Sequence, residues 1–291
     1  MLVHNYETFE KLLKDHSHLF HRDEIEAALK FYVLALSGDV HAMLEIATVY
    51  RHMEHYSDSV HWLTEADHLG HLQAAYELGN SYFEGLGVEE DYKMAFEYYK
   101  KAAEKGHADA ANNLADMYLN GEGVSMNEKE ALHWFTFAAS KEVVEAMYTL
   151  GIMYEQGIGV KVDKETAFQY YFKSAEGGYE EAQYRVGSVF LDGLLGQERN
   201  VPEALHWFER AAKSHHIDSI YNLGFLYENG LGVLRNGKKA LYYYKRAALL
   251  GDYQAKLNIA TIYELGLDVP KDKKEASKWR KAAMHQMDTS E

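Results

Sequence analysis

The feature that most constrains this chain is a five-residue phrase that recurs at a nearly constant interval. It reads EGLGV at 84–88, NGEGV at 120–124, QGIGV at 156–160 and NGLGV at 229–233, with degenerate copies at 192–196 and 265–269. The first glycines of successive copies are 36, 36, 36, 37 and 36 residues apart. A fixed period of this size is typical of a repeat array, in which each unit buries its apolar face only against its neighbours.

Two helical patterns lie within each period. The first is A-x-x-x-[LIV]-[GA]-x-x-[YF], as in AAYELGNSY (74–82) and AMYTLGIMY (146–154). The second pairs aromatic residues with a C-terminal alanine pair, as in AFEYYKKAA (95–103) and ALHWFERAA (204–212). Small and apolar residues at these spacings lie on one face of a helix. The sequence therefore predicts a helix pair in each period, and weaker copies extend the array back to residue 28.

Together, the period, the loop and both helix patterns resemble Sel-1-like repeats, the 36-residue relatives of tetratricopeptide repeats. The resemblance implies an all-α fold: a right-handed α–α superhelix (solenoid) of about seven helix-pair repeats with a concave inner face. We expect a capping helix region at 1–27, the solenoid at 28–285 and a short tail at 286–291. Members of this family generally act as protein-binding scaffolds. Many exported members carry paired cysteines, and this chain has no cysteine.

The glycine phrase itself invites comparison with a phosphate-binding loop. Such a loop occurs once and follows a strand, but this phrase recurs and lies between two helical patterns. We therefore expect Gly121 to end a helix, Gly123 to let the chain reverse and Val124 to pack under the loop. Glycine also recurs just after second helices, and Glu142 and His215 replace it in two units. A left-handed residue there is most favourable as glycine, so these two turns are predicted to be strained or differently built.

Composition limits the possible partners and location. The net charge of −15 disfavours nucleic acid and anionic membranes, because both repel an acidic surface. The absence of cysteine excludes disulfides, thiolate nucleophiles and cysteine zinc sites. Neither a signal-peptide pattern nor an apolar run long enough to span a bilayer is visible. We therefore expect a cytoplasmic protein without membrane insertion, and the sequence leaves its oligomeric state open.

The sequence gives little support for catalysis or metal binding. Ten of the 16 histidines lie in residues 1–71, which makes a histidine-based metal site an alternative hypothesis. However, no HExxH motif and no serine–lysine motif of the S-x-x-K type occurs. We predict no catalytic residues, no metal ligands and no cofactor, and we treat an enzyme or metal-binding protein as the least favoured function.

Candidate binding residues come from the first helix of each unit. By analogy with tetratricopeptide packing, its residues three and six places after the opening small residue face inward. These positions vary between units while their flanks do not, as expected where packing constraints are relaxed. The asparagines suit contacts with a peptide backbone, Arg185 suits a carboxylate and Phe225 suits an apolar anchor. The predicted protein-binding residues are Asn80, Asn113, Asp116, Arg185, Asn222, Phe225 and Asn258.

The sequence thus favours a non-enzymatic scaffold or adaptor that holds a protein or peptide segment on its concave face. A second hypothesis is a dedicated inhibitor or immunity protein that sequesters a single toxin or enzyme. An acidic surface suits a basic target of that kind. The identity of the partner is not encoded in the recurring residues, because these residues report packing.

Overall fold

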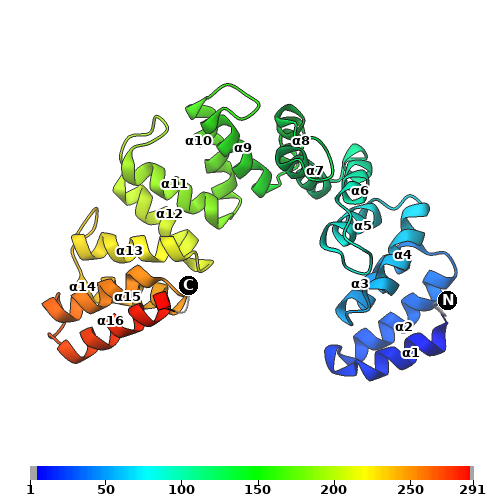
Figure 1. Cartoon of the computed structure of the whole chain (residues 1–291), viewed down its shortest axis with the longest axis horizontal. Helices are drawn as coiled ribbons and strands as arrows, with labels where there is room; N and C mark the ends of the chain where they lie inside the picture. Colours follow the sequence, from blue (N-terminus) through cyan, green and yellow to red (C-terminus); the bar gives the residue numbers. More distant parts are fainter. Residues whose placement is uncertain (1–4, 289–291) are drawn as a thin grey trace. The chain divides into compact units, whose positions relative to one another are not determined.

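The computed structural model of the chain describes residues 5–288 (Figure 1). Within these residues the chain is all-helical, with sixteen α-helices, one short 3-10 turn and no strand. The elements are α1 (Tyr6–Asp15), η1 (Ser17–Leu19), α2 (Arg22–Leu36), α3 (Val40–His52), α4 (Tyr56–His68), α5 (Leu72–Glu84), α6 (Tyr92–Glu104), α7 (Ala108–Asn120), α8 (Glu128–Ser140), α9 (Val144–Gln156), α10 (Lys164–Glu176), α11 (Glu180–Asp192), α12 (Val201–Lys213), α13 (Ile217–Asn229), α14 (Gly237–Leu249), α15 (Tyr253–Leu265) and α16 (Lys273–Asp288).

Consecutive helices pack as pairs, from α3–α4 to α15–α16, and α1 packs on α2 ahead of them. The chain divides into two compact units, residues 1–143 (unit 1) and residues 144–291 (unit 2). Within each unit, the second helix of a pair packs against the first helix of the next pair. This arrangement confirms the predicted all-α solenoid of about seven helix pairs.

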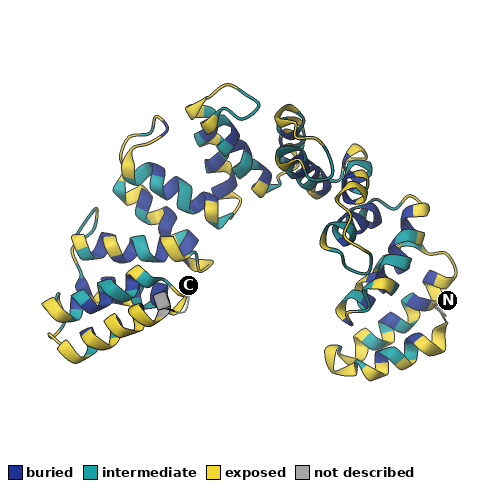
Figure 2. Ribbon diagram, in the orientation of Figure 1, coloured by how far each residue is buried: buried dark blue, intermediate teal, exposed yellow. Residues whose placement is uncertain are grey.

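Aromatic residues that recur in the second helices lie in the core. In unit 1, Phe9 stacks on Tyr32 with ring centroids 4.3 Å apart, and Tyr32 meets Trp62 at 5.6 Å. In unit 2, Trp207 is buried and meets Phe172 at 5.3 Å. Figure 2 shows the buried residues on the faces where consecutive helices meet. A helix pair cannot bury this apolar face alone, so the neighbouring pairs are required for stability.

A mid-helix glycine recurs in the first helices because an aromatic ring from the second helix lies against its backbone. A Cβ atom built on Gly79 would lie 2.5 Å from Cδ1 of Tyr99, and one on Gly224 would lie 2.7 Å from Cδ1 of Tyr244. Overpacking of this kind costs about 1–3 kcal/mol. That cost offsets the roughly 1 kcal/mol that alanine gains over glycine in a helix. The ring of the second helix therefore explains why glycine recurs at this position.

The glycine phrase is a turn between the two helices of a pair. Gly121 caps α7 in the left-handed conformation, with φ +75°, and its amide donates to the carbonyl of Met117 at 2.9 Å. Gly123 also has a positive φ, +68°. A Cβ on Gly123 would lie 2.2 Å from the carbonyl oxygen of Tyr92, at the start of α6. The second glycine therefore serves both the chain reversal and a close contact with the preceding helix pair.

Two turns and the boundaries of the repeat region can be compared with the positions expected from the sequence. Glu142 and His215 both have positive φ, +67° and +65°, which confirms the two strained turns. The expected boundary between residues 27 and 28 falls inside α2, and the expected boundary after residue 285 falls inside α16. Of the predicted tail, residues 289–291 lie outside the described part of the chain.

Candidate functional site

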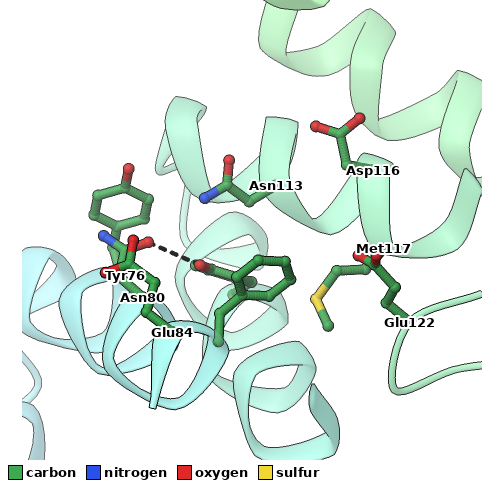
Figure 3. Close-up of a pocket in the computed structure, with 9 residues that line it drawn as sticks. Tyr76, Asn80, Glu84, Asn113, Asp116, Met117 and Glu122 are labelled. Atoms are coloured by element: carbon green, nitrogen blue, oxygen red, sulfur yellow. Dashed lines mark hydrogen bonds between the residues drawn. The ribbon is translucent and has the colours of Figure 1, made fainter. Parts of the chain in front are cut away.

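A cavity of about 370 Å³ opens between α5, α6 and α7 in unit 1 (Figure 3). Three of the residues predicted from the sequence line it: Asn80 on α5, and Asn113 and Asp116 on α7. They come from two successive first helices, as the three-and-six spacing predicts. The complete lining is Tyr76, Asn80, Phe83, Glu84, Tyr99, Asn113, Asp116, Met117 and Glu122.

Hydrogen bonds fix the orientation of Asn80 at one wall of the cavity. The hydroxyl of Tyr99 on α6 donates to Oδ1 of Asn80 at 2.8 Å (Figure 3). Burial raises the pKa of Tyr99, so this hydroxyl remains a donor at neutral pH. The Asn80 amide lies 3.4 Å from the carboxylate of Glu77, which in turn pairs with Arg51 at 2.8 Å. The wall is thus held by a chain of contacts from α3 to α6.

Carboxyl groups give the cavity its charge. Glu84 ends α5, Asp116 lies on α7 and Glu122 lies in the glycine phrase that follows. Burial, followed by the nearby charge of Glu122, raises the pKa of Asp116 to about 6. None of the nine lining residues is basic. Because the ionised form of Asp116 is disfavoured by its surroundings, a cation in the cavity would relieve a cost that is already present.

Aromatic rings form the other walls. The ring centroids of Tyr76 and Tyr99 are 6.1 Å apart, and those of Phe83 and Tyr99 are 6.5 Å apart. Tyr76 is held from outside by His107, which stacks on it at 4.5 Å with an interplanar angle of 18°. The cavity therefore combines flat π-surfaces with carboxylates, a combination suited to a flat cation.

In unit 2, Arg185 on α11 is already engaged within the protein. Its guanidinium donates to Glu155 on α9, and it lies over the ring of Tyr171 on α10 at 5.5 Å from the centroid. The hydroxyl of Tyr171 donates to the same carboxylate at 2.8 Å. A partner carboxylate would have to compete with this pair for the guanidinium.

The remaining predicted residues lie on α13 and α15. Asn222 is half-buried, and Phe225, one turn further along α13, is 39% exposed. Asn258 on α15 donates to the hydroxyl of Tyr221 at 3.1 Å and accepts from the amide of Gln254 at 3.1 Å. Asn258 therefore links α15 to α13, while Phe225 presents an apolar surface that a partner could cover.

Six of the nine lining residues were not among the predicted ones. Tyr99 recurs as a core aromatic residue, so its second role at the cavity wall has no separate signal in the sequence. Glu122 belongs to the glycine phrase, which the sequence identifies as structural. The sequence offers one signal for the missed residues, which is their closeness to a predicted residue on the same helix. Phe83 follows Asn80, and Met117 follows Asp116, within a single helical turn. The lining residues missed by the sequence analysis are Tyr76, Phe83, Glu84, Tyr99, Met117 and Glu122.

Between residues 5 and 288, no group of three or more His, Cys, Asp or Glu side chains is placed to hold a metal ion. Over the same residues, no helix combines the length and apolar character that crossing a membrane requires.

Helix pairs that repeat along the chain and pack each on the next define a helical repeat protein. The chain belongs to the Sel1 repeat family, whose model matches it in six consecutive segments. These segments are 72–107, 108–143, 144–179, 180–216, 217–252 and 254–285. The family assignment agrees with the resemblance found in the sequence.

Solved structures support the same assignment. A Sel1 repeat protein from Oxalobacter formigenes is 32% identical, covers 83% of this chain and 99% of its own, and gives a TM-score of 0.74. The protein c5321, a protective antigen of uropathogenic Escherichia coli strains with an SLR fold, is 27% identical. That match covers 89% of this chain and 64% of the other, with a TM-score of 0.54. Comparison with curated proteins gave no match.

Proposed function

We propose that this protein is a non-enzymatic scaffold that holds a segment of another protein against the first helices of its repeats. The observation that carries the proposal is the meeting of Asn80, Asn113 and Asp116 at one cavity. These residues vary in type from repeat to repeat, while the glycines and rings around them recur. Variable side chains on a rigid, repeated frame are the usual basis of specificity in repeat proteins.

The chemistry of this face suits an extended polypeptide. The amide groups of Asn113 and Asn222 can each donate to and accept from a peptide backbone. The exposed ring of Phe225 offers an apolar contact in unit 2, and the rings of Tyr76 and Phe83 offer one in unit 1. Aromatic anchors surrounded by polar contacts are typical of protein-binding surfaces.

Selection from a phage-displayed library of random dodecapeptides tests the proposal. The immobilised full chain should enrich peptides whose binding weakens about tenfold on Asn113→Ala or Asn222→Ala, equivalent to about 1.4 kcal/mol. Asn120→Ala is the matched control, because Asn120 is exposed at the end of α7 and does not line the cavity. Each variant is also melted, so that lost binding is separated from lost folding. Failure to enrich any peptide, or equal weakening by Asn120→Ala, would contradict the proposal.

A dedicated inhibitor of one basic protein is the second candidate function. It is favoured by the charge of unit 1, in which 25 Asp and Glu outnumber 11 Lys and Arg for a net charge of −14. Unit 2 carries 20 acidic and 19 basic residues, a net charge of −1. An inhibitor would bind one protein tightly with a salt-dependent association rate, but a scaffold would bind several partners more weakly.

A further inference from the structure

The repeats allow one unit to be compared with the other, position by position. Residues 72 apart occupy the same place two repeats later, as the family segments 108–143 and 180–216 begin 72 residues apart. By this correspondence, Arg185 in unit 2 occupies the place of Asn113 in unit 1. Likewise, Tyr171 corresponds to Tyr99. The cavity of unit 1 and the surroundings of Arg185 are thus the same location in two repeats.

In unit 2 this location is filled by the chain's own arginine. The guanidinium of Arg185 lies over the Tyr171 ring and pairs with Glu155, which also accepts from the Tyr171 hydroxyl. A cation, an aromatic face and a carboxylate are therefore already combined there. This arrangement shows that the helix-pair frame accommodates an arginine between the two first helices and the ring of the intervening second helix.

In unit 1 the frame is the same but the arginine is replaced by a shorter side chain. Asn113 reaches less far than an arginine, and a cavity of about 370 Å³ lies beside it. The corresponding rings are retained, Tyr99 for Tyr171 and Tyr76 for Tyr148, and Phe83 adds further aromatic surface. The carboxylate at position 155 has no counterpart, because Phe83 stands there. Instead, the cavity has three carboxyl groups of its own, those of Glu84, Asp116 and Glu122.

We propose that this cavity binds an arginine side chain of a partner polypeptide, in the place that Arg185 fills in unit 2. The inference rests on the proposed function and names the chemistry that the partner must present. Arginine is favoured over lysine because a planar guanidinium stacks on rings and donates in several directions at once. The carboxyl groups of Glu84, Asp116 and Glu122 are the matching acceptors, and the net charge of −14 attracts a basic segment to this unit.

A methionine in the cavity wall provides a direct reporter. Met117 lines the cavity, and Met153 is buried in unit 2 as an internal reference. The full chain, labelled with carbon-13 at its methionine methyl groups, is titrated with N-acetyl-arginine-N-methylamide and followed by NMR. The Met117 resonance is assigned with Met117→Leu. It should shift and saturate while that of Met153 stays in place.

The citrulline analogue is the matched probe, because it has nearly the same shape as arginine without the charge. It should leave the Met117 resonance unchanged, and the lysine analogue should bind more weakly than the arginine compound. An unchanged Met117 resonance with the arginine compound, or an equal shift with the citrulline compound, would overturn the proposal.

Charge-removing variants test the carboxyl groups. Asp116→Asn combined with Glu122→Gln should raise the Kd for the arginine probe about fivefold or more. The control is Glu97→Gln with Glu104→Gln, which removes the same charge from exposed positions on α6. An equal loss of affinity in the control would mean that net charge alone attracts the probe, and the assignment to this cavity would fail.

A variant that supplies an arginine from the chain itself tests the comparison between the units. Asn113→Arg places a tethered guanidinium where Arg185 stands in unit 2, so the arginine probe should no longer shift Met117. Asn113→Gln, which is uncharged and shorter, should keep the response. If Asn113→Arg bound the probe like the wild type, or melted well below Asn113→Gln, the cavity would not be an arginine site.

The selected peptides separate this inference from the proposed function. When an enriched peptide depends on Asn113, its arginines are replaced by citrulline one at a time, and one replacement should abolish most of the binding. Retained binding after every replacement would overturn the arginine site and leave the scaffold function standing. Enrichment of no peptide at all would instead contradict the scaffold function itself.

Discussion

At the scale of single residues, Asp116 is the group whose environment is most informative. Burial and the neighbouring Glu122 raise its pKa to about 6, above the ordinary value of 3.8. The amide of Asn112 donates to its carboxylate at 3.5 Å, a distance too long to stabilise the charge well. A half-buried carboxylate held at a cost, at the wall of a cavity, is typical of a binding site.

This shift predicts a pH-dependent effect of Asp116→Asn on stability. A raised folded-state pKa means that the contribution of Asp116 to stability is fully present below the unfolded pKa, near 4, and is lost as pH rises through about 6. The variant should therefore stabilise the protein at pH 7.5 by about 1–3 kcal/mol, since one pKa unit corresponds to about 1.4 kcal/mol. At pH 4.5 the gain should nearly vanish. Thermal melts at both pH values measure it, and destabilisation at pH 7.5 would show that the carboxylate is favourably placed.

At the scale of helices, the start of α7 depends on a histidine. The Nδ1 atom of His107 accepts from the amide of Ala110 at 3.2 Å, and Nε2 lies 2.9 Å from Oε1 of Gln73. The ring also stacks on Tyr76, at the cavity wall. Capping through Nδ1 requires the neutral ring, and burial lowers the pKa of His107. His216 caps α13 in the same way, through Ser219.

The cap predicts a loss of stability in mild acid. The folded-state pKa of His107 is lowered. Its contribution to folding stability is therefore present above the unfolded pKa, about 6.5, and is lost as pH falls through the folded-state pKa. Asparagine caps a helix without titrating. Between pH 7.5 and pH 5, the free energy of unfolding of His107→Asn should therefore fall by about 1 kcal/mol less than that of the wild type. His133→Asn, at an exposed position on α8, is the control. Identical pH profiles for wild type and His107→Asn would contradict this account.

Most of the helical framework could be predicted from the sequence, but one side-chain interaction could not. The period, the helix pairs and the cap at Gly121 could be predicted because each repeat imposes the same packing on the same position. The grouping of Asn80, Asn113 and Asp116 at one cavity agrees with the placement expected by analogy with tetratricopeptide packing. The engagement of Arg185 by Glu155 could not be predicted, because these residues lie 30 positions apart and meet only through side-chain conformation.

The cavity itself depends on a difference between repeats. Asparagine at 113 and arginine at 185 are equally acceptable to the repeat pattern, yet one leaves a cavity and the other fills the corresponding space. Tyr99 and Glu122 were missed for a related reason, since each occupies a position that the pattern explains by packing or by the turn. In such a protein, the residues that set binding specificity are expected at positions that differ between repeats. A pattern built from the shared positions does not identify them.

At the scale of the whole molecule, two units with separate cores carry very different charge. Unit 1 has a net charge of −14 and unit 2 a net charge of −1, although both are built from the same repeat. The acidic unit also holds the cavity with three carboxyl groups. We therefore expect unit 1 to account for most of the salt dependence of partner binding.

We infer that a partner polypeptide binds on the first helices, beginning at the cavity of unit 1. Hydrogen–deuterium exchange of the full chain, with and without a peptide enriched by selection, measures where such a segment lies. We expect slower exchange at α5, α7 and the loop that contains Glu122, with α8 unchanged. Protection confined to the second helices α6 and α8, or protection that persists in the Asn113→Ala variant, would contradict it.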